Sequence, residues 1–325
     1  MIVHASSLIP KHLAWIIVLA VTMLGTSLRA GDITGIVAFG DSLSDVGNTY
    51  IADGIPPPPY YRGHYSNGPI WLEYLANSLG VPAPTASLAG GTDNAWGGAE
   101  TGSGLSFEST PNIGTQITTY LGSHTLSSTQ LITIWGGAND FLNGGVTNPA
   151  VPVANLISEI STLAAAGGKQ FLVPNLPLLG DLPATNTLPQ ANRDALNFLT
   201  LTFDSMLYSQ LNQLQGKLGI TIHQVDIDSV FQNIIANPGA YGLTNVTDSA
   251  IADGNLSGQG YLFWDTVHPT TVIQALIGAT AFATVVLEPS SLTLVLIAAP
   301  LLLAWKRRAA VTSPGLRPRD GSGRA

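Results

Sequence analysis

The chain has 325 residues, of which 45% are hydrophobic and only 10% are charged, so it is long and apolar enough to bury a full core. Its formal net charge is −8 and its pI is about 5.0, so it lacks the excess of positive charge on which nucleic-acid binding depends. It contains no cysteine, which excludes thiolate catalysis, disulfides and cysteine-based zinc sites. We therefore expect one large domain stabilised by its core alone.

The first thirty residues have the layout of a secretory signal peptide. Lys11 and His12 precede an apolar run over residues 13–24, and a short stretch of small and polar residues ends at Ala30. The apolar run is shorter than the roughly 20 residues that span a bilayer, which favours a cleaved signal over an anchor. We expect residues 1–30 to be removed by cleavage after Ala30.

Residues 287–325 contain a second apolar segment. The letters EPSS at 288–291 precede an apolar run over 292–305, and the basic cluster KRR follows at 306–308. This order resembles the PEP-CTERM sorting tails of exported Gram-negative proteins, which implies processing by an exosortase, although Leu287 replaces the usual proline and further residues follow the arginines. The alternative is a plain membrane anchor with its positive charges on the cytoplasmic side. Both interpretations place the domain outside the cytoplasm, at the cell surface, in the outer envelope or in the medium.

Between these ends, short apolar runs alternate with segments of helical spacing. Continuous apolar runs are typical of strands that are buried on both faces, and they cover residues 36–39, 131–135, 171–173 and 220–222. Apolar residues at helical spacing predict helices over residues 69–79, 190–218 and 270–286. Strands that alternate with helices indicate a parallel sheet covered on both sides. We expect residues 31–286 to form this domain.

In such a sheet the functional site lies at the carboxyl ends of the strands, so polar residues that follow a strand are candidates. Ser42, in FGDSLSD, follows the first predicted strand. It is either a nucleophile or the cap of a following helix, because serine is also a preferred N-cap. Asn139, in WGGAND, follows the second strand, and its amide suits an oxyanion donor, although an ordinary turn would also contain it.

Two further motifs supply the other parts of a nucleophilic site. His268 follows Asp265 by three residues in FWDTVHPTT, a spacing at which a carboxylate in a tight turn can orient an imidazole. In NAWGGAET, Gly98 would let a backbone N–H approach an oxyanion, and Gly97 is the alternative because two adjacent glycines leave the register open. Each motif alone would more often be a simple turn.

Together, in this order, the motifs resemble those of GDSL-type SGNH hydrolases, a family of esterases and lipases. The likeness spans nearly all of residues 33–286 and rests on FGDSLSDVGN at 39–48, NAWGGA at 94–99, GAND at 137–140 and DTVHP at 265–269. It implies a three-layer α/β/α sandwich with a mainly parallel, flavodoxin-like sheet of about five strands. Residues 62–80 and 237–248 further resemble the secreted phospholipase or lecithinase-like branch.

The resemblance also implies roles for individual residues. Ser42 would be the nucleophile, His268 the base and Asp265 its orienting carboxylate, and an oxyanion hole would be formed by the N–H groups of Ser42 and Gly98 with the Asn139 amide. The implied reaction is hydrolysis of lipid or short-chain carboxyl esters through an acyl-enzyme, without a metal or cofactor. The acyl chain length and the alcohol stay open.

Three alternatives also stay open. The same machinery could serve a polysaccharide O-acetylesterase, and the C-terminal tail would suit a catalytically inactive surface or matrix protein on the same fold. A metal-dependent phosphoesterase would need oxygen and imidazole ligands at one sheet edge, but the available set lacks the paired ligands of two-metal sites. That set comprises Asp41, Asp45, Asn139, Asp140 and His268.

Overall fold

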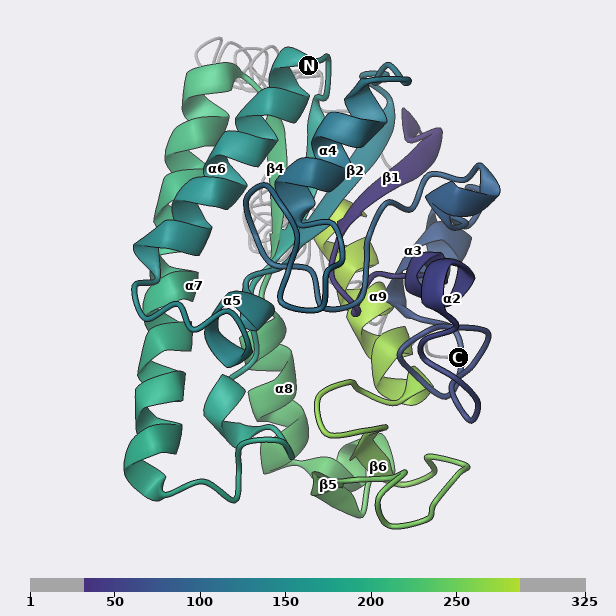
Figure 1. Cartoon of the computed structure of the whole chain (residues 1–325), viewed down its shortest axis with the longest axis vertical. Helices are drawn as coiled ribbons and strands as arrows, with labels where there is room; N and C mark the ends of the chain where they lie inside the picture. Colours follow the sequence, from purple (N-terminus) through teal and green to yellow (C-terminus); the bar gives the residue numbers. More distant parts are fainter. Residues whose placement is uncertain (1–31, 287–325) are drawn as a thin grey trace, which may run out of the picture.

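The computed structural model describes residues 32–286 (Figure 1). The predicted signal peptide and sorting tail lie outside these residues. Within this range, none of the helices has both the length and the apolar character needed to cross a bilayer.

A parallel sheet of four strands forms the centre of the domain. The strands lie side by side in chain order, and each overlaps one of the four apolar runs in the sequence: β1 (Gly35–Gly40), β2 (Gln130–Trp135), β3 (Gln170–Pro174) and β4 (Thr221–Val225). Phe39 of β1 is level with Ile134 of β2, so both strands end at the same edge. The carboxyl ends of β1 and β2, which the motifs follow, are therefore neighbours.

An extended segment over residues 92–96 covers the free edge of β1. The Ala38 N–H donates to the Thr92 carbonyl (3.0 Å), the Asn94 N–H donates to the Ala38 carbonyl (2.8 Å), and the Trp96 N–H donates to the Gly40 carbonyl (3.1 Å). This is the slanted pattern of a parallel strand, so the segment occupies the place of a fifth strand beside the four regular ones. It leads directly into the two glycines at the carboxyl end of β1.

Helices cover both faces of the sheet, which confirms the predicted α/β sandwich (Figure 1). One layer contains α4 (Ile113–Leu121), α6 (Ala150–Ala165) and α7 (Gln190–Leu218), and the opposite layer contains α3 (Trp71–Leu79) and α9 (Thr271–Val286). The predicted helices 190–218 and 270–286 match α7 and α9. The predicted helix 69–79 begins later, because the Glu73 side chain accepts the Ile70 N–H and makes Ile70 the N-terminal cap.

Shorter elements lie mainly around the ends of the sheet. They are α2 (Asn48–Asp53), α5 (Ala138–Leu142), α8 (Ile227–Ala236), the 3₁₀ turns η2 (Ser87–Ala89), η3 (Leu179–Asp181) and η4 (Pro238–Tyr241), and the strands β5 (Asn245–Ser249) and β6 (Tyr261–Phe263). The two last strands form a separate parallel pair, seen at the bottom of Figure 1. The segment after β6 carries His268 back towards the main sheet.

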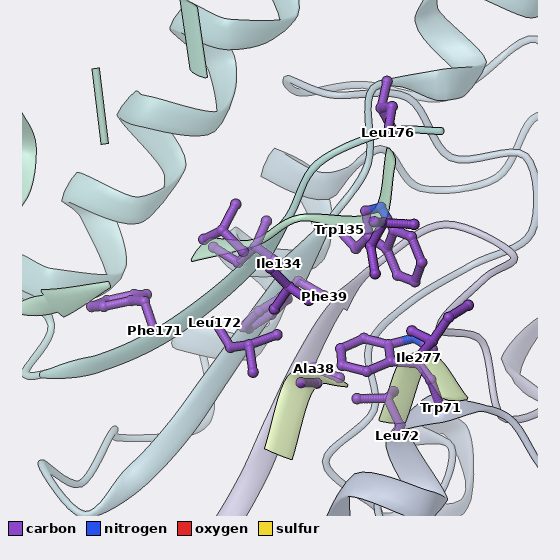
Figure 2. Close-up of a cluster of buried hydrophobic side chains, with 14 of the residues drawn as sticks. Ala38, Phe39, Trp71, Leu72, Ile134, Trp135, Phe171, Leu172, Leu176 and Ile277 are labelled. Carbon is purple, nitrogen blue, oxygen red and sulfur yellow. The ribbon is translucent and has the colours of Figure 1, made fainter. Parts of the chain in front are cut away.

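Large apolar side chains fill the space between the sheet and its helices (Figure 2). Trp71 of α3 meets Trp135 of β2 edge to face, with ring centroids 5.5 Å apart, and both rings are buried. Full burial of each large apolar side chain contributes about 1.5–3 kcal/mol. The Trp135 indole N–H also donates to the Asn175 carbonyl (3.1 Å), which ties the ends of β2 and β3 together. The strand ends that carry the site are therefore firmly packed.

Candidate active site

Ser42 lies in the tight turn that follows β1. The Asp41 carbonyl accepts the N–H groups of Ser44 (3.0 Å) and Asp45 (3.1 Å), and the next helix does not begin until Asn48. The N–H groups at the start of that helix, those of residues 47–49, donate to the Asp45 carboxylate instead. The interpretation of Ser42 as the cap of this helix is therefore wrong, because the Asp45 carboxylate caps it and the Ser42 hydroxyl is left to bind another partner.

Ser42, His268 and Asp265 form a continuous hydrogen-bonded row. Nε2 of His268 is 2.7 Å from the Ser42 Oγ, and Nδ1 of His268 is 2.7 Å from the Asp265 Oδ2. The other carboxylate oxygen of Asp265 accepts the backbone N–H groups of Val267 (2.8 Å) and His268 (2.7 Å). A tight turn thus joins Asp265 to His268, three residues later, as the sequence predicted. The fold then places His268 beside Ser42, 226 residues away in the chain.

The electrostatics of the row keep the acid ionised beside the imidazole. Burial by itself would raise the pKa of Asp265, but the His268 charge and the hydrogen bonds from His268 and Val267 lower this pKa to about 2. Burial would lower the pKa of His268, but the Asp265 charge and hydrogen bond raise it above 6.5. Burial raises the pKa of the nearby Asp41 to about 6, against the attraction of His268.

These directions predict an acidic limit to activity. Only neutral His268 can accept a proton, and its folded pKa lies above 6.5, so kcat/KM should fall as the pH drops through a midpoint above 6.5. The Asp41→Asn substitution removes a negative charge that favours the imidazolium, so it should move this midpoint to lower pH. A pH profile of kcat/KM for both proteins checks the prediction. A midpoint below 6.5, or a shift to higher pH in the variant, would contradict it.

Tyr60 is a further member of the site that the sequence analysis missed. Its hydroxyl donates to the Asp265 Oδ2 (2.8 Å), the same oxygen that holds His268, and its ring meets Trp264 edge to face. It follows the proline run at 56–59, but no sequence spacing relates it to Asp265, 205 residues further on. Only the folded chain shows that this loop reaches the carboxylate.

Replacing Tyr60 with phenylalanine should lower kcat by about fivefold to tenfold, since one hydrogen bond to a charged group is lost while Asp265 keeps its other donors. A carboxylate with one donor fewer attracts the imidazolium more strongly, so the acidic midpoint of kcat/KM should rise. Kinetics over a pH series, with thermal unfolding as the control for the fold, measure both effects. A lower melting temperature with unchanged kinetics would mean that Tyr60 only stabilises the loop.

The two adjacent glycines differ in what their N–H groups can do. The Gly97 N–H already donates to the Asp45 carboxylate (3.1 Å) and the Thr49 hydroxyl (2.8 Å). The Gly98 N–H has no acceptor among residues 32–286, and Gly98 borders the cavity in front of Ser42. Its φ of 72° favours glycine, and a Cβ there would collide with Glu108. The geometry therefore favours Gly98 over Gly97 as a donor.

Asn139 comes to the same cavity from α5, directly after β2. One of its amide hydrogens donates to the Ala99 carbonyl (2.9 Å), which leaves the other for a bound group. The neighbouring Asp140 carboxylate accepts the Thr101 N–H (3.0 Å) and hydroxyl (2.6 Å), and so ties the glycine-rich loop to α5. Asn139 and Gly98 are thereby held relative to each other.

The same contacts argue against the metal-dependent alternative. The carboxylates of Asp45 and Asp140 already accept hydrogen bonds, chiefly from backbone N–H groups. Over residues 32–286, no three His, Asp or Glu side chains are grouped in a way that could hold a metal ion. Both carboxylates are better explained as structural groups that hold the loops around Ser42 in place through these hydrogen bonds.

A cavity of about 360 Å³ opens in front of the row. It brings together Ser42, His268, Gly98 and Asn139, and Asp265 lies behind His268. The remaining lining residues are Tyr65, Glu108, Leu142, Asn143, Ala184, Thr185 and Val267. The cavity thus presents a hydroxyl with a base on one side, amide donors nearby, and a mixed apolar and polar wall.

The family model described as GDSL-like Lipase/Acylhydrolase matches residues 36–280 of the chain. The protein belongs to the GDSL lipase/acylhydrolase family. This confirms the family suggested by the sequence motifs, and as a GDSL hydrolase the protein is a carboxylic ester hydrolase. Its matched region falls inside the domain expected over residues 31–286.

Several named proteins are similar to this GDSL hydrolase. Phosphatidylcholine-sterol acyltransferase of Aeromonas hydrophila is 28% identical over 295 residues, covering 74% of this chain and 86% of the relative. Thermolabile hemolysin of Vibrio parahaemolyticus is 27% identical over 271 residues, covering 75% of this chain and 62% of the hemolysin. A solved structure of a putative arylesterase from Agrobacterium tumefaciens aligns with a TM-score of 0.45 and 17% identity, covering 78% of this chain and 98% of that one.

Proposed function

We propose that the protein hydrolyses carboxyl esters with Ser42 as nucleophile, His268 as base and Asp265 as the carboxylate that orients it. The observation that carries this proposal is the row of two 2.7 Å contacts from Ser42 through His268 to Asp265, which ends at the cavity. Nucleophile and base within hydrogen-bond reach, with the base oriented by a third group, is the arrangement that activates a serine.

In the proposed reaction the Ser42 oxygen attacks the ester carbonyl while His268 Nε2 takes the hydroxyl proton. Asp265 stabilises the imidazolium, and the carbonyl oxygen, now negative, accepts hydrogen bonds from the N–H groups of Ser42 and Gly98 and from the Asn139 amide. His268 returns the proton to the departing alcohol. Water, deprotonated by the same imidazole, then attacks the acyl-enzyme, and the bond from the acyl carbon to the Ser42 oxygen breaks to release the acid. His268 returns the proton to the Ser42 oxygen, which restores the starting state.

We place the substrates among lipid or short-chain carboxyl esters. The apolar part of the wall, with Leu142, Ala184 and Val267, suits an acyl or alkyl group. The names of the two relatives refer to a phosphatidylcholine-sterol acyltransferase and a hemolysin, which supports the lipid side and the proposed phospholipase-like branch. A polysaccharide O-acetylesterase is the competing proposal, and a preference for acetyl groups on sugars would favour it.

We further propose that the enzyme acts after export. The support is the signal-like segment over residues 1–30 and the tail over 287–325, which would serve as an exosortase substrate or a membrane anchor. The hydrolase domain would then occupy residues 31–286.

The proposal is tested by covalent labelling together with a chain-length series. A fluorophosphonate probe should add one phosphonyl group to the peptide that contains Ser42, and the protein should turn over p-nitrophenyl esters with a rate that depends on acyl length. Labelling at another residue would overturn the assignment of Ser42. No label and no turnover across the ester series would favour an inactive surface protein on this fold.

Asn139→Ala is expected to lower kcat by about a hundredfold or more while KM changes little, because the lost hydrogen bond forms mainly with the negative oxygen of the transition state. Steady-state kinetics on the best p-nitrophenyl ester measure this loss. Asn148→Ala, at a position that does not line the cavity, is the matched control. A large rise in KM with an unchanged kcat would mean that Asn139 only binds the substrate.

A further inference from the structure

Glu108 places a carboxylate at the wall of the cavity, beside Gly98. It is the one Asp, Glu, Lys or Arg among the described lining residues, and the salt bridges found within residues 32–286 do not include it. Its carboxylate reaches so close to Gly98 that a Cβ at that glycine would collide with Oε2. A negative charge therefore borders the position at which a negative oxygen would form.

The loop that carries Glu108 is held in place. Its turn is closed by the Ser106 N–H, which donates to the Thr110 carbonyl (2.8 Å), and by the contact between the two hydroxyls of these residues (2.8 Å). The Thr110 hydroxyl then donates to the Gly97 carbonyl (2.7 Å), and the Glu108 N–H donates to the Ser106 hydroxyl (3.2 Å). The turn is thus tied to the glycine pair, so the carboxylate stays next to the cavity although its side chain is exposed.

The position is unfavourable for a neutral ester. A carboxylate beside the oxyanion opposes the negative charge of the transition state, and no lysine or arginine within residues 32–286 pairs with it. A positive group on the substrate would remove this penalty and turn it into an attraction. The negative charge of Glu108 therefore favours esters that carry a positive group of their own.

Tyr65 offers a second contact for such a cation. Its ring lies 5.0 Å from the His268 ring, between centroids, and borders the same cavity. Its hydroxyl is buried, which leaves the ring as the part of the Tyr65 side chain that can contact a ligand. An aromatic ring attracts ammonium groups through its face. Because His268 protonates the departing alcohol in the proposed mechanism, a ring beside His268 flanks the alcohol part of the substrate.

We propose that the enzyme prefers esters whose alcohol carries an ammonium group, of the choline type, held between the Glu108 carboxylate and the Tyr65 ring. This inference rests on the proposed function and names its substrate class. The ammonium group takes no part in bond making. Its attraction to the carboxylate lowers the free energy of the bound ester, and in the transition state it also offsets the repulsion between Glu108 and the negative oxygen.

The test compares choline esters with 3,3-dimethylbutyl esters, in which carbon replaces the positive nitrogen, both made with the acyl chain preferred in the p-nitrophenyl series. We expect kcat/KM of the wild type to favour the choline ester by about tenfold or more, an advantage that should shrink with added salt. Glu108→Gln should abolish most of this preference and leave the neutral ester equal or faster. Asp53→Asn, which removes an exposed charge outside the cavity, should keep the preference.

Tyr65 variants separate the ring from the hydroxyl. Tyr65→Phe should keep the preference for the choline ester and Tyr65→Leu should reduce it. An equal loss of kcat/KM for both esters in Glu108→Gln would overturn the proposal. It would mean that Glu108 acts through His268. An equal rate for the two esters in the wild type would also overturn it, while the turnover of the neutral ester would leave the proposed function standing.

Calorimetric titration with choline and with 3,3-dimethyl-1-butanol tests the site without turnover. Tighter binding of choline to the wild type, lost in Glu108→Gln, supports the cation site even if no ester is hydrolysed. Equal binding of the two alcohols would overturn the cation site.

Discussion

Ser42→Ala is expected to lower kcat/KM for p-nitrophenyl esters by about 10⁴-fold or more, because without the hydroxyl no acyl-enzyme can form. The loss should fall mainly on kcat, since the walls of the cavity stay in place. Stability should change little, because Ser42 lies in a turn and, within residues 32–286, its side chain makes its hydrogen bond to His268. Steady-state kinetics, with a thermal melt beside them, measure both quantities.

Ser44→Ala is the matched control for this experiment. Ser44 belongs to the same turn and is fully buried, but its hydroxyl has no hydrogen-bond partner among the described residues. Its removal should therefore leave kcat/KM within a few fold of wild type. If both alanine variants lost activity equally, the turn itself would be responsible and the role proposed for the Ser42 hydroxyl would be wrong.

Asp265→Asn is expected to lower kcat by about 10³–10⁴-fold, because an amide in place of the carboxylate favours the wrong imidazole tautomer and cannot stabilise the imidazolium. The carboxylate accepts hydrogen bonds from Tyr60, Val267 and His268. The asparagine cannot satisfy all these donors, since one of its two terminal atoms is itself a donor.

The same substitution should lower stability in a pH-dependent way. The folded pKa of Asp265 is about 2, below its usual 3.8. Its ionisation therefore stabilises the fold above pH 3.8 by about 2 kcal/mol, and this contribution disappears as the pH falls towards 2. Denaturant unfolding at pH 7 and near pH 2 should show a large difference between wild type and variant at pH 7 and a smaller one at low pH.

Asp253→Asn provides the comparison for both measurements. Asp253 also accepts a tyrosine hydroxyl, that of Tyr261 (2.9 Å), but at the surface and away from the cavity. The Asp253→Asn variant should retain the activity and most of the stability of the wild type. Loss of activity in Asp253→Asn as deep as in Asp265→Asn would show that the effect does not depend on the row.

The strands and long helices could be predicted from the sequence, because each corresponds to a continuous pattern of apolar residues. The four apolar runs became the four strands, and the spacing over residues 190–218 became α7. The segment that pairs with the free edge of β1 was harder to predict. Residues 92–96 lack a strong apolar run, and their pairing with β1 depends on backbone hydrogen bonds that any sequence can make.

Part of the candidate site could also be predicted from the sequence, because the predicted strands indicate which residues lie together. A parallel sheet gathers the residues that follow its strands, so Ser42 and Asn139 were expected to meet. The FGDSLSD motif alone did not decide between a helix cap and a nucleophile at Ser42, because that depends on which side chain accepts the first N–H groups of α2, and Asp45 accepts them. It also could not relate Tyr60 to Asp265, since contacts between distant loops leave no spacing in the chain.

By itself, the sequence determined the α/β class, the family, and the serine, histidine and acid that the proposed reaction uses, because strand burial and short local motifs are properties of neighbouring residues. Only the tertiary structure shows that the Gly97 N–H is taken by Asp45 and Thr49, while the Gly98 N–H has no acceptor among residues 32–286 and Gly98 borders the cavity. It also placed Glu108 against Gly98. Both outcomes depend on how separate loops share space and hydrogen bonds, which is settled only when the chain closes around its core.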